Sequence, residues 1–461
     1  MDVRTPRRVL VVGGGPCGLV TQRNLVERGE FEEVLLVERR DDVGGVWYLE
    51  DAPKAGKPHW PSPAYPGLVG NVLPEYLSFS GARFPPTGSE VHPYPTLKQT
   101  HAYLKAFAEP YIARGHIRLE AEVVWVDERP EGRGWDVTMR DWTAEGNGRE
   151  TVRRWDAVVV ATAWYDFPSW PDTTPGLAEA RERGLATHAQ AWMGPEGYKA
   201  KRVAVVGNAN SSNDIAAQLK SVAHTPVYRS IRRQGLRRFA YLPDARVVDV
   251  PPIARYTITP AGNLDLLLAD GRTLTNIDHV VLGTGYKAAA APFVRVRSAN
   301  GLQPLTSAHT SPPRIPSLYA HILYAPNPSL AFIGTVMSYT PFTLADVAST
   351  WLCLVWRNRL AIPHTLDARL AGEQARIALV EEVRTKLGGD GASSLVAYHI
   401  LAPAERAYAQ GLKDAIRRIH PPWAELLPDW SEQDWVRREA MYERKWMSLE
   451  AEREAGVVAK L

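Results

Sequence analysis

Three glycines and one acidic residue near the N-terminus have the types and spacing needed to bind a dinucleotide. Gly13, Gly15 and Gly18 form a GxGxxG pattern after an apolar run, and Glu38 ends a second apolar run. In such a turn the first glycine permits the tight bend, the second lets a pyrophosphate approach the helix N-terminus, and the third lets helix and strand pack closely. The Glu38 carboxylate would then accept hydrogen bonds from a ribose. Residues 7–47 therefore predict a strand–helix–strand unit that holds a dinucleotide.

A related stretch at residues 201–219 predicts a second unit of the same kind. Gly207 is retained there, but Ala209 and Ser212 replace the other two glycines of the pattern. Small residues at these positions still permit the helix to approach the strand, although less easily than glycine does. The chain is therefore expected to contain two dinucleotide folds.

A base replaces the acid in the second unit. When the alignment is carried forward, Arg232 stands at the position of Glu38. An arginine suits the 2′-phosphate that distinguishes NADPH from NADH, because its planar guanidinium binds phosphate oxygens in pairs. Arg229, Arg232 and Arg233 could instead form only a solvated basic face. The position of Arg232 favours NADPH.

The elements that must position these turns form an α/β chain with one unit inserted into another. Residues 155–171 and 277–286 each end an apolar strand in a short threonine-centred turn, which suits strands that carry the chain between domains. We therefore expect two Rossmann-like domains. Residues 1–163 and 286–461 would form a discontinuous FAD-type domain, and residues 164–285 an inserted NADPH-type domain.

The C-terminal sequence predicts a mostly helical region. Helical periodicity is clear at residues 344–360, 368–387 and 432–454, with proline and glycine between the segments. We assign these helices to packing, because stripes of Trp and Tyr at helical spacing are more often core than cofactor contacts.

Composition excludes several classes of function. The 461 residues carry a net charge of +3 with the basic residues spread along the chain, so nucleic acid is not an expected partner. Cys17 and Cys353 are the only cysteines, which excludes disulfide frameworks, zinc ribbons and the dithiol chemistry of a pyridine-nucleotide disulfide reductase. No apolar run reaches the roughly 18 residues of a membrane span, and the N-terminus does not resemble a signal peptide. We expect a cytoplasmic protein, and a homodimer on the base rate for soluble enzymes.

Seven ordered motifs give the chain a resemblance to the flavin-containing monooxygenases, also called class B flavoprotein monooxygenases. In chain order they are GGGPCG with Glu38, GGVW at residues 44–47, GNVLPEYLSF at residues 70–79, GNANSSNDIA, SIRR, LGTGY and LAFIGTVMSYTPFTLAD. The resemblance implies FAD in the first fold and NADPH in the second, with hydride transfer to the flavin and dioxygen trapped as a C4a-(hydro)peroxyflavin. It further implies N- or S-oxygenation of a small organic substrate.

The resemblance also assigns site residues. Asn71 matches the asparagine of the family's TNLPKE-like segment, although Gly70 stands where that segment has Thr, and its amide could donate to the activated oxygen and the flavin edge. From the residues alone, Asn71 could instead cap a turn before Leu73 and Pro74. Trp47 resembles the tryptophan of the family's GGxW turn, whose apolar bulk keeps water from the flavin. Cofactor contacts are expected from Gly13, Gly15, Pro16, Gly18, Glu38, Gly45, Val46, Trp47, Val123, Thr162, Gly207, Asn208, Asn210, Ser211, Ser212, Asp214, Ser230, Arg232 and Thr284.

One motif departs from the family pattern and leaves alternatives open. The fingerprint FxGxxxHxxx(Y/F) is present with Gly184 and His188, but Glu182 replaces its Phe. Trp192 at its last position is the residue type of the related Baeyer–Villiger monooxygenases, although Met193 follows where those enzymes have Pro or Asp. Oxygenation of a ketone is therefore the alternative to N- or S-oxygenation, and an FAD-binding sensor without catalysis is a further one. His188 itself could be a linker histidine satisfied by backbone.

Overall fold

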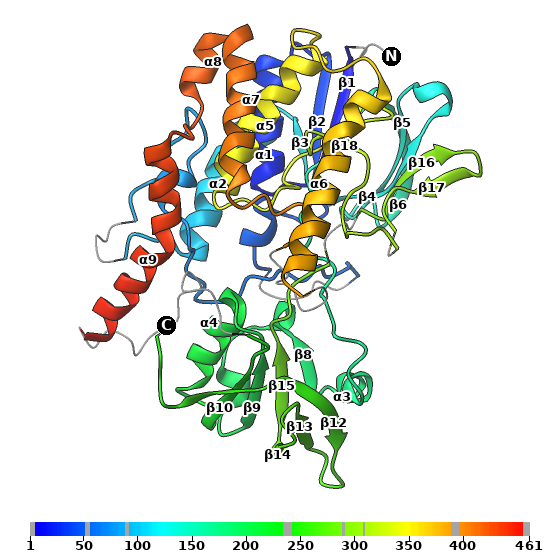
Figure 1. Ribbon diagram of the computed structural model, residues 1–461. Helices are drawn as coiled ribbons and strands as arrows, with labels where there is room; N and C mark the ends of the chain where they lie inside the picture. The colour runs from blue at the N-terminus through cyan, green and yellow to red at the C-terminus, as the bar shows by residue number, and fades with distance from the viewer. Residues whose placement is uncertain are drawn as a thin grey trace.

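The first dinucleotide unit is part of a seven-stranded sheet (Figure 1). The computed structural model describes residues 5–50, 56–87, 92–233, 242–287, 291–307, 309–388 and 396–454. As the sequence predicts, β1 (Arg8–Val12), α1 (Pro16–Arg28) and β2 (Glu33–Val37) follow one another, with β1 and β2 parallel. The full strand order is β18 (Leu318–Tyr319), β19 (Leu323–Tyr324), β20 (Leu330–Phe332), β7 (Ala157–Val160), β1, β2 and β3 (Ile117–Arg118).

Both faces of this sheet are covered, which explains why its strands are apolar throughout. Val9 and Val11 of β1 pack with the helical layer that includes α1, α2 (Leu97–Ala113) and α5 (Pro341–Trp356). Leu10 and Val12 point to the other face and pack against a second sheet that contains the fully buried Trp135. That second sheet has the order β17 (Gly301–Pro304), β16 (Val294–Ser298), β4 (Ala121–Glu128), β5 (Trp135–Asp141) and β6 (Arg149–Trp155).

The second dinucleotide unit forms a separate sheet, drawn in green in the lower part of Figure 1. Its strand order is β11 (Val247–Val250), β10 (His224–Ser230), β9 (Arg202–Val206), β15 (His279–Leu282) and β8 (Ala186–His188). The helix α4 (Asn210–Leu219) follows β9 in the same way that α1 follows β1. Beside this unit lie α3 (Leu177–Glu182) and a three-stranded sheet of β12 (Ile253–Ile258), β13 (Leu264–Leu268) and β14 (Thr273–Ile277).

The connections confirm an α/β fold of two Rossmann-like units with the second inserted in the first. The chain leaves the first unit after β7, and β16 rejoins it by pairing parallel with β4. The two crossing segments run side by side, since Pro168 and Tyr286 form an antiparallel bridge and the Ser169 amide donates to the Gly285 carbonyl at 2.8 Å. The threonine-centred turns therefore lie where the chain passes between the units.

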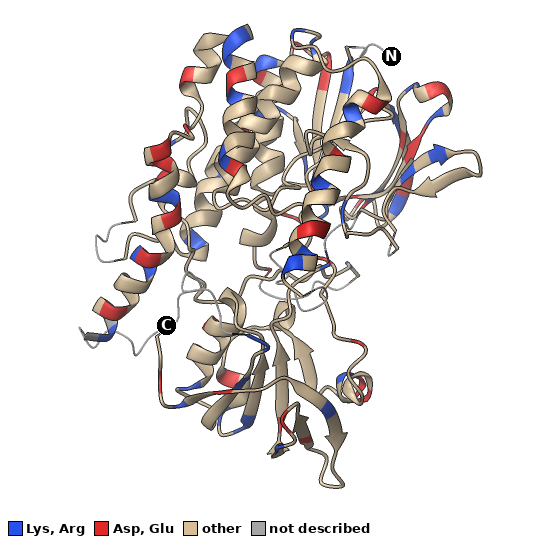
Figure 2. Ribbon diagram, viewed as in Figure 1, with Lys and Arg blue, Asp and Glu red and all other residues tan. Residues whose placement is uncertain are grey.

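The C-terminal region is helical, as predicted, with two helices that the sequence pattern did not single out. The predicted helices are α5, α6 (Leu366–Lys386) and α9 (Glu432–Glu454), and the additional ones are α7 (Ala404–Ile419) and α8 (Pro421–Leu426). Figure 2 shows charged residues along the outer helices α6 and α9, whereas α5 is almost uncharged and packs on α1. Within the part of the chain that the structure describes, no helix is long and apolar enough to cross a membrane.

Candidate cofactor and active site

The first glycine turn joins β1 to α1 and leaves room for a ligand at one position. Gly13 has a φ of +108°, and a Cβ on Gly18 would lie 1.9 Å from the Gly13 carbonyl oxygen, so both positions require glycine. A Cβ on Gly15, in contrast, would make only an ordinary contact with the Gly45 Cα at 3.5 Å. The protein itself therefore does not require a glycine at position 15. A pyrophosphate that approaches the N-terminus of α1, where Pro16 is the first residue, accounts for it.

The Glu38 carboxylate is fixed beside this turn. It is 7% exposed and accepts hydrogen bonds from the Gly14 amide at 2.7 Å and the Arg40 amide at 3.0 Å. A carboxylate has about four acceptor sites, so two remain for the hydroxyls of a ribose. Gly14 was not predicted as a site residue. A Cβ there would lie 2.9 Å from the Glu38 Cβ, so a side chain at position 14 would displace Glu38. The residues of the first turn thus fit the adenosine diphosphate portion of FAD.

The GGVW motif folds back over the phosphate turn. Gly44 donates to the Gly14 carbonyl at 2.8 Å, and a Cβ on Gly45 would lie 2.8 Å from the Gly15 Cα. Arg40, which the sequence did not single out, positions this turn by donating to the carbonyl oxygens of Gly45 at 2.9 Å and Trp60 at 2.8 Å. The next carbonyl, of Val46, accepts from the Ser62 hydroxyl at 2.8 Å. The backbone before Trp47 is therefore fixed from two sides.

The Asn71 segment lies against Trp47. The Gly70 amide donates to the Pro95 carbonyl at 2.8 Å, and a Cβ on Gly70 would lie 3.8 Å from Cη2 of the Trp47 indole. Asn71 is partly exposed, and its side chain makes no hydrogen bond with the described residues. The short helix η2 (Pro74–Tyr76) has Leu73 as its N-cap, without a side-chain cap. The capping role considered for Asn71 is therefore not observed, and its amide is available to a ligand.

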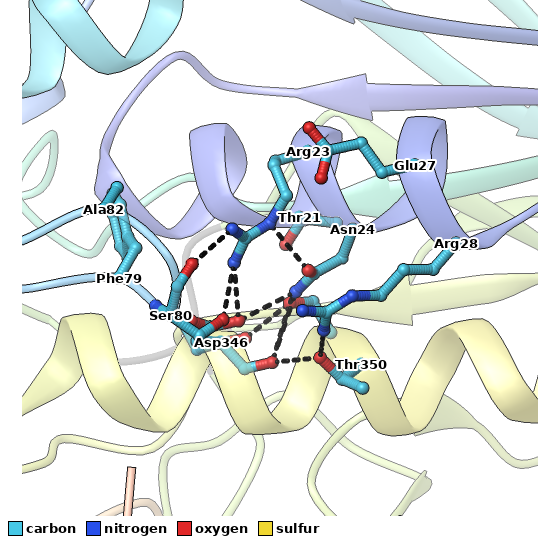
Figure 3. A network of polar contacts seen from close by, with 12 residues as sticks. Thr21, Arg23, Asn24, Glu27, Arg28, Phe79, Ser80, Ala82, Asp346 and Thr350 are labelled. Carbon is cyan, nitrogen blue, oxygen red and sulfur yellow. Dashed lines mark hydrogen bonds and ion pairs between the residues drawn. The ribbon is translucent and has the colours of Figure 1, made fainter. Parts of the chain in front are cut away.

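The far end of the same segment is anchored in a buried polar network between α1 and α5 (Figure 3). The Ser80 amide donates to the Asp346 carboxylate at 2.7 Å, and Arg23 donates to the Ser80 carbonyl at 2.6 Å and to Asp346 at 3.0 Å. Asn24 donates to Asp346 at 3.1 Å. Such a network is favourable only when each member is satisfied, and here it fixes the loop to the helix that follows the phosphate turn.

The second glycine turn has the same backbone with different side chains. Gly207 has a φ of +116°. Ser212 takes the position of the third glycine, and its hydroxyl donates to the Gly283 carbonyl at 3.2 Å. Asn210 begins α4 and Ser211 is exposed beside it, while the Asn208 carbonyl accepts from the side-chain amide of Asn213 at 3.3 Å. The turn is thus well formed, and the N-terminus of α4 is open to an anion.

The predicted equivalence of Arg232 with Glu38 is wrong by one residue. Val12 pairs with Val37 in the first unit, and the equivalent Val206 pairs with Ser230 in the second. Ile231 therefore follows the strand where Glu38 does, and Arg232 comes one residue later. The cause is that α4 is three residues shorter than α1, whereas β10 has two extra residues between His224 and Tyr228 where it pairs with β9. A constant sequence offset cannot show either change.

The basic residues near this strand end separate into two kinds. Arg229 is 3% exposed and forms an ion pair with Asp249 at 2.7 Å, so it is not part of a solvated basic face. Arg232 is exposed and has no hydrogen-bond or ion-pair partner among the described residues. Ser230 is buried, and its hydroxyl donates to the Pro251 carbonyl at 3.1 Å. Because a phosphate needs donors, this geometry favours Arg232 over Ser230 as its ligand.

Asp214 lies further along α4 than the nucleotide turn to which the sequence assigned it. Its carboxylate accepts a hydrogen bond from the Tyr65 hydroxyl at 2.7 Å, which joins the second unit to the segment that leads to Asn71. Burial raises the pKa of the Asp214 carboxyl above its usual range. The structure therefore places Asp214 at the junction between the two units.

The remaining predicted residues lie around the crossing. Thr162 is exposed at the end of β7, with its Cγ2 3.4 Å from where a Cβ on Gly13 would lie. Thr284 donates to the carbonyl of Ser169. Val123 lies on β4, two residues after Ala121, whose amide donates to the Glu38 carbonyl at 2.9 Å.

His188 is a buried residue of the same junction. It is 4% exposed, its Nδ1 accepts from the Gln190 amide at 3.1 Å, and its ring packs on Tyr286 with centroids 5.2 Å apart. Burial lowers the pKa of its imidazole to about 4, so it is neutral at neutral pH. Trp192, at the end of the fingerprint, is 2% exposed and stacks on Tyr198 at 5.1 Å. Both side chains are therefore packed inside the fold.

Comparisons with known proteins agree with this geometry. The family model for flavin-binding monooxygenase-like proteins matches residues 6–236. The thiol-specific monooxygenase of Saccharomyces cerevisiae is 29% identical, with 81% of this chain and 82% of the relative covered. In fold, the chain is similar to S-allyl-L-cysteine S-oxygenase from Allium sativum, with a TM-score of 0.71 at 22% identity over 96% of this chain and 99% of the other, and to cyclohexanone monooxygenase, with a TM-score of 0.58 at 16% identity over 90% and 98%. The chain therefore belongs to the flavin-binding monooxygenase-like family, and it is a flavoprotein monooxygenase whose cofactors are FAD and NADPH.

Proposed function

We propose that this enzyme oxygenates the sulfur or nitrogen atom of a small organic molecule, with Asn71 as its catalytic residue. The observation that carries the proposal is the Asn71 side chain, which makes no hydrogen bond with the described residues and directly follows Gly70, the residue that lies against Trp47 where the GGVW turn folds over the phosphate turn. The names of two similar proteins, a thiol-specific monooxygenase and an S-oxygenase, support sulfur as the target.

The proposal divides the cofactors between the two units. We assign FAD to residues 1–163 and 286–461, with contacts from Gly13, Gly15, Pro16, Gly18, Glu38, Gly45, Val46, Trp47, Val123 and Thr162. We assign NADPH to residues 164–285, with contacts from Gly207, Asn208, Asn210, Ser211, Ser212, Arg232 and Thr284. In this assignment Ser230 ends the strand just before Arg232, and Asp214 of α4 ties the second unit to the first through Tyr65.

The residues of the chain position and protect the reaction. FAD held by the first unit would supply the acceptor for the hydride of NADPH and the chemistry that activates dioxygen, so no amino-acid nucleophile is required. The Asn71 amide donates a hydrogen bond toward the reacting oxygen, which a carboxylate at that position could not do. The Trp47 indole and the backbone around Gly70 restrict the entry of water to the same place.

The experiment measures which substrate receives oxygen. Purified enzyme, NADPH and O₂ are offered equimolar thioanisole and cyclohexanone, and the sulfoxide and lactone are quantified by mass spectrometry with ¹⁸O₂. We expect labelled sulfoxide in large excess, and N71A to consume NADPH while releasing hydrogen peroxide in place of sulfoxide. An Asn71→Ala variant that forms sulfoxide at the normal yield per NADPH would contradict the role of Asn71.

Oxygenation of a ketone is the second candidate, and Trp192 was the residue that favoured it. In the structure its indole is packed in the second unit and donates to Gln218 at 3.3 Å, so its residue type has a structural explanation. The likeness to cyclohexanone monooxygenase concerns the fold alone. Predominant lactone in the competition experiment would favour this candidate.

The sensor alternative makes a different prediction about the reduction of the flavin. Anaerobic mixing of the FAD-loaded enzyme with NADPH should bleach the flavin absorbance, because the second turn is open and Arg232 is exposed beside it. An enzyme with full FAD that NADPH does not reduce would support the sensor and overturn the proposed function.

We further propose that the enzyme acts in the cytoplasm as a homodimer. The support is compositional: two unpaired cysteines suit a reducing compartment, and dimers are the commonest assemblies of soluble enzymes. Cell fractionation and light scattering on a sizing column test these two statements.

A further inference from the structure

A buried lysine in the middle of α9 holds the backbone just before Asn71. The Lys445 side chain is 8% exposed, and its ammonium donates to the carbonyl oxygens of Gly70 at 2.6 Å and Val69 at 3.1 Å. It also lies 5.4 Å from the ring centroid of Tyr94. Burying a cation is costly unless it is paired, so two convergent carbonyls and an aromatic face form a specific site for this ammonium.

Gly70 explains why such a contact is needed. Glycine restricts its own φ and ψ less than any other residue, and the TNLPKE-like segment of the family has Thr at this position. A Cβ on Gly70 would lie 3.2 Å from the Pro95 carbonyl oxygen, so a larger residue would require a shift. The Val69 and Gly70 carbonyls belong to the two peptide planes that flank the Gly70 Cα. By bonding both, Lys445 sets the backbone that leads into Asn71.

The same lysine acts on the second unit through its charge. Asp214 of α4 accepts from the Tyr65 hydroxyl, and the positive charge of Lys445 lowers the pKa of this carboxyl against the effect of burial. The middle of α9, the helix that follows the second nucleotide turn and the segment before Asn71 therefore meet at Lys445.

Other contacts attach α9 to the rest of the fold. The Tyr94 hydroxyl donates to the carbonyl of Met441, a residue that is 1% exposed, and the Arg438 Nε donates to the Thr340 hydroxyl at 3.2 Å. The Arg438 guanidinium also lies 4.7 Å from the ring centroid of Tyr76. Tyr94 thus docks the helix through its hydroxyl and faces Lys445 with its ring, so a substitution that removes only the hydroxyl changes the docking contact and keeps the ring beside Lys445.

We propose that Lys445 is a positioning residue that fixes Gly70 and thereby aims the Asn71 amide at the reaction site beside Trp47. This inference rests on the proposed role of Asn71. The C-terminal helix then has a function beyond packing. It restrains the backbone at position 70, which a glycine by itself leaves free to adopt many conformations.

The first experiment measures the restraint itself. Hydrogen–deuterium exchange of the FAD-loaded enzyme is followed in a peptide that contains residues 69–73, for wild type, K445M, K445R and Y94F. We expect exchange about tenfold faster in K445M, which corresponds to about 1.4 kcal/mol for the loss of charge-assisted hydrogen bonds. K445R should restore most of the protection. Y94F, which removes a docking contact, should lower Tm and leave this peptide protected.

The second experiment measures yield of oxygenated product per NADPH. We expect K445M to bind FAD and to be reduced by NADPH, but to divert most of its turnover to hydrogen peroxide. Arg444 is exposed and adjacent on α9, so R444M is the matched control and should keep the normal yield. In an N71A background, K445M should cause no further loss, because a residue that acts through Asn71 has nothing left to position.

The outcomes separate the inference from the proposed function. Unchanged exchange at residues 69–73 in K445M, or losses of K445M and N71A that simply add, would overturn the positioning role. A normal product yield in N71A would instead refute the catalytic role of Asn71, while the exchange measurement still reports the contact. If K445M does not retain FAD, K445Q replaces it in both experiments, because its amide keeps a donor while removing the charge and shortening the reach.

Discussion

The two dinucleotide turns bring helix and strand together with different residues. In the first, Gly18 stands where a Cβ would lie 1.9 Å from the Gly13 carbonyl oxygen, and the opposite strand is followed by Ala161. In the second, Ser212 stands in place of Gly18, and the opposite strand is followed by Gly283, where a Cβ would lie 2.1 Å from the Ser212 hydroxyl. The glycine is therefore on the helix in the first unit and after the opposite strand in the second unit. The close approach therefore depends on the pair of residues, and a missing third glycine does not abolish the fold.

The two turns also differ in how they face the adenosine end of a cofactor. Glu38 is buried and bound by two backbone amides, which suits neutral ribose hydroxyls. The second strand ends in Ile231 followed by exposed Arg232, which suits a charged group at the surface. The first turn thus contains a buried carboxylate, Glu38, whereas the second has an exposed guanidinium, Arg232, near its strand end.

The largest effect should come from placing a side chain in the first turn. We expect G18A to lose FAD and to be destabilised by about 3 kcal/mol or more, because the added carbon meets a backbone carbonyl that no rotamer change can move. The FAD content per chain and Tm measure this. S212A at the equivalent position of the second unit is the control and should shift Tm only slightly. Full FAD occupancy in G18A would contradict the comparison.

The next effect concerns the base of the second turn. We expect R232Q to raise KM for NADPH about tenfold to a hundredfold, the usual range for a lost charge-assisted contact to phosphate, and to leave KM for NADH unchanged. R233Q is the control, because Arg233 is equally exposed one residue later. Equal effects on NADPH and NADH would show that Arg232 does not recognise the 2′-phosphate.

The outcome for Arg232 shows what a sequence can and cannot establish here. The glycines, the apolar runs and the threonine-centred turns are local signals, and they predicted both units and the insertion. The register of β10 was predicted wrongly by one residue because similarity at the glycine turn fixes neither the length of the helix that follows nor an irregularity within the next strand. A sequence offset measures chain length, whereas strand pairing is set by hydrogen bonds.

Contacts between distant segments were the other part that the sequence could not show. Asp214 was assigned to the nucleotide turn because it is close to that turn in the sequence, but its partner is Tyr65 in the other unit. Lys445 lies 375 residues from Gly70, and its helix was assigned to packing. Arg40 had no motif of its own, although it fixes the turn before Trp47. Helical periodicity indicates that a face is buried and does not indicate what covers it.

Acid should affect the junction of the second unit through His188. The pKa of this buried imidazole is about 4, below its ordinary value near 6.5, so between these values the unfolded chain binds a proton that the folded chain does not. Stability is therefore complete above pH 6.5 and decreases as the pH falls. We expect a loss of about 1 to 2 kcal/mol from this residue by pH 5. Tm measured from pH 7 to 5 should fall less steeply in H188Q than in wild type, and identical slopes would show that His188 does not contribute.

The smallest effect tests the exchange of residues between the two turns most directly. We expect G283A to be destabilised by about 1 to 2 kcal/mol and to be reduced more slowly by NADPH, because the new carbon meets the Ser212 side chain, which can move in part. Adding S212G to G283A creates the arrangement of Gly18 and Ala161 and should restore both properties. Tm and the rate of anaerobic flavin reduction in the two single variants and the double variant give the coupling between the positions. Losses that simply add would mean that each residue serves its own surroundings, and the second turn would then have to be explained without reference to the first.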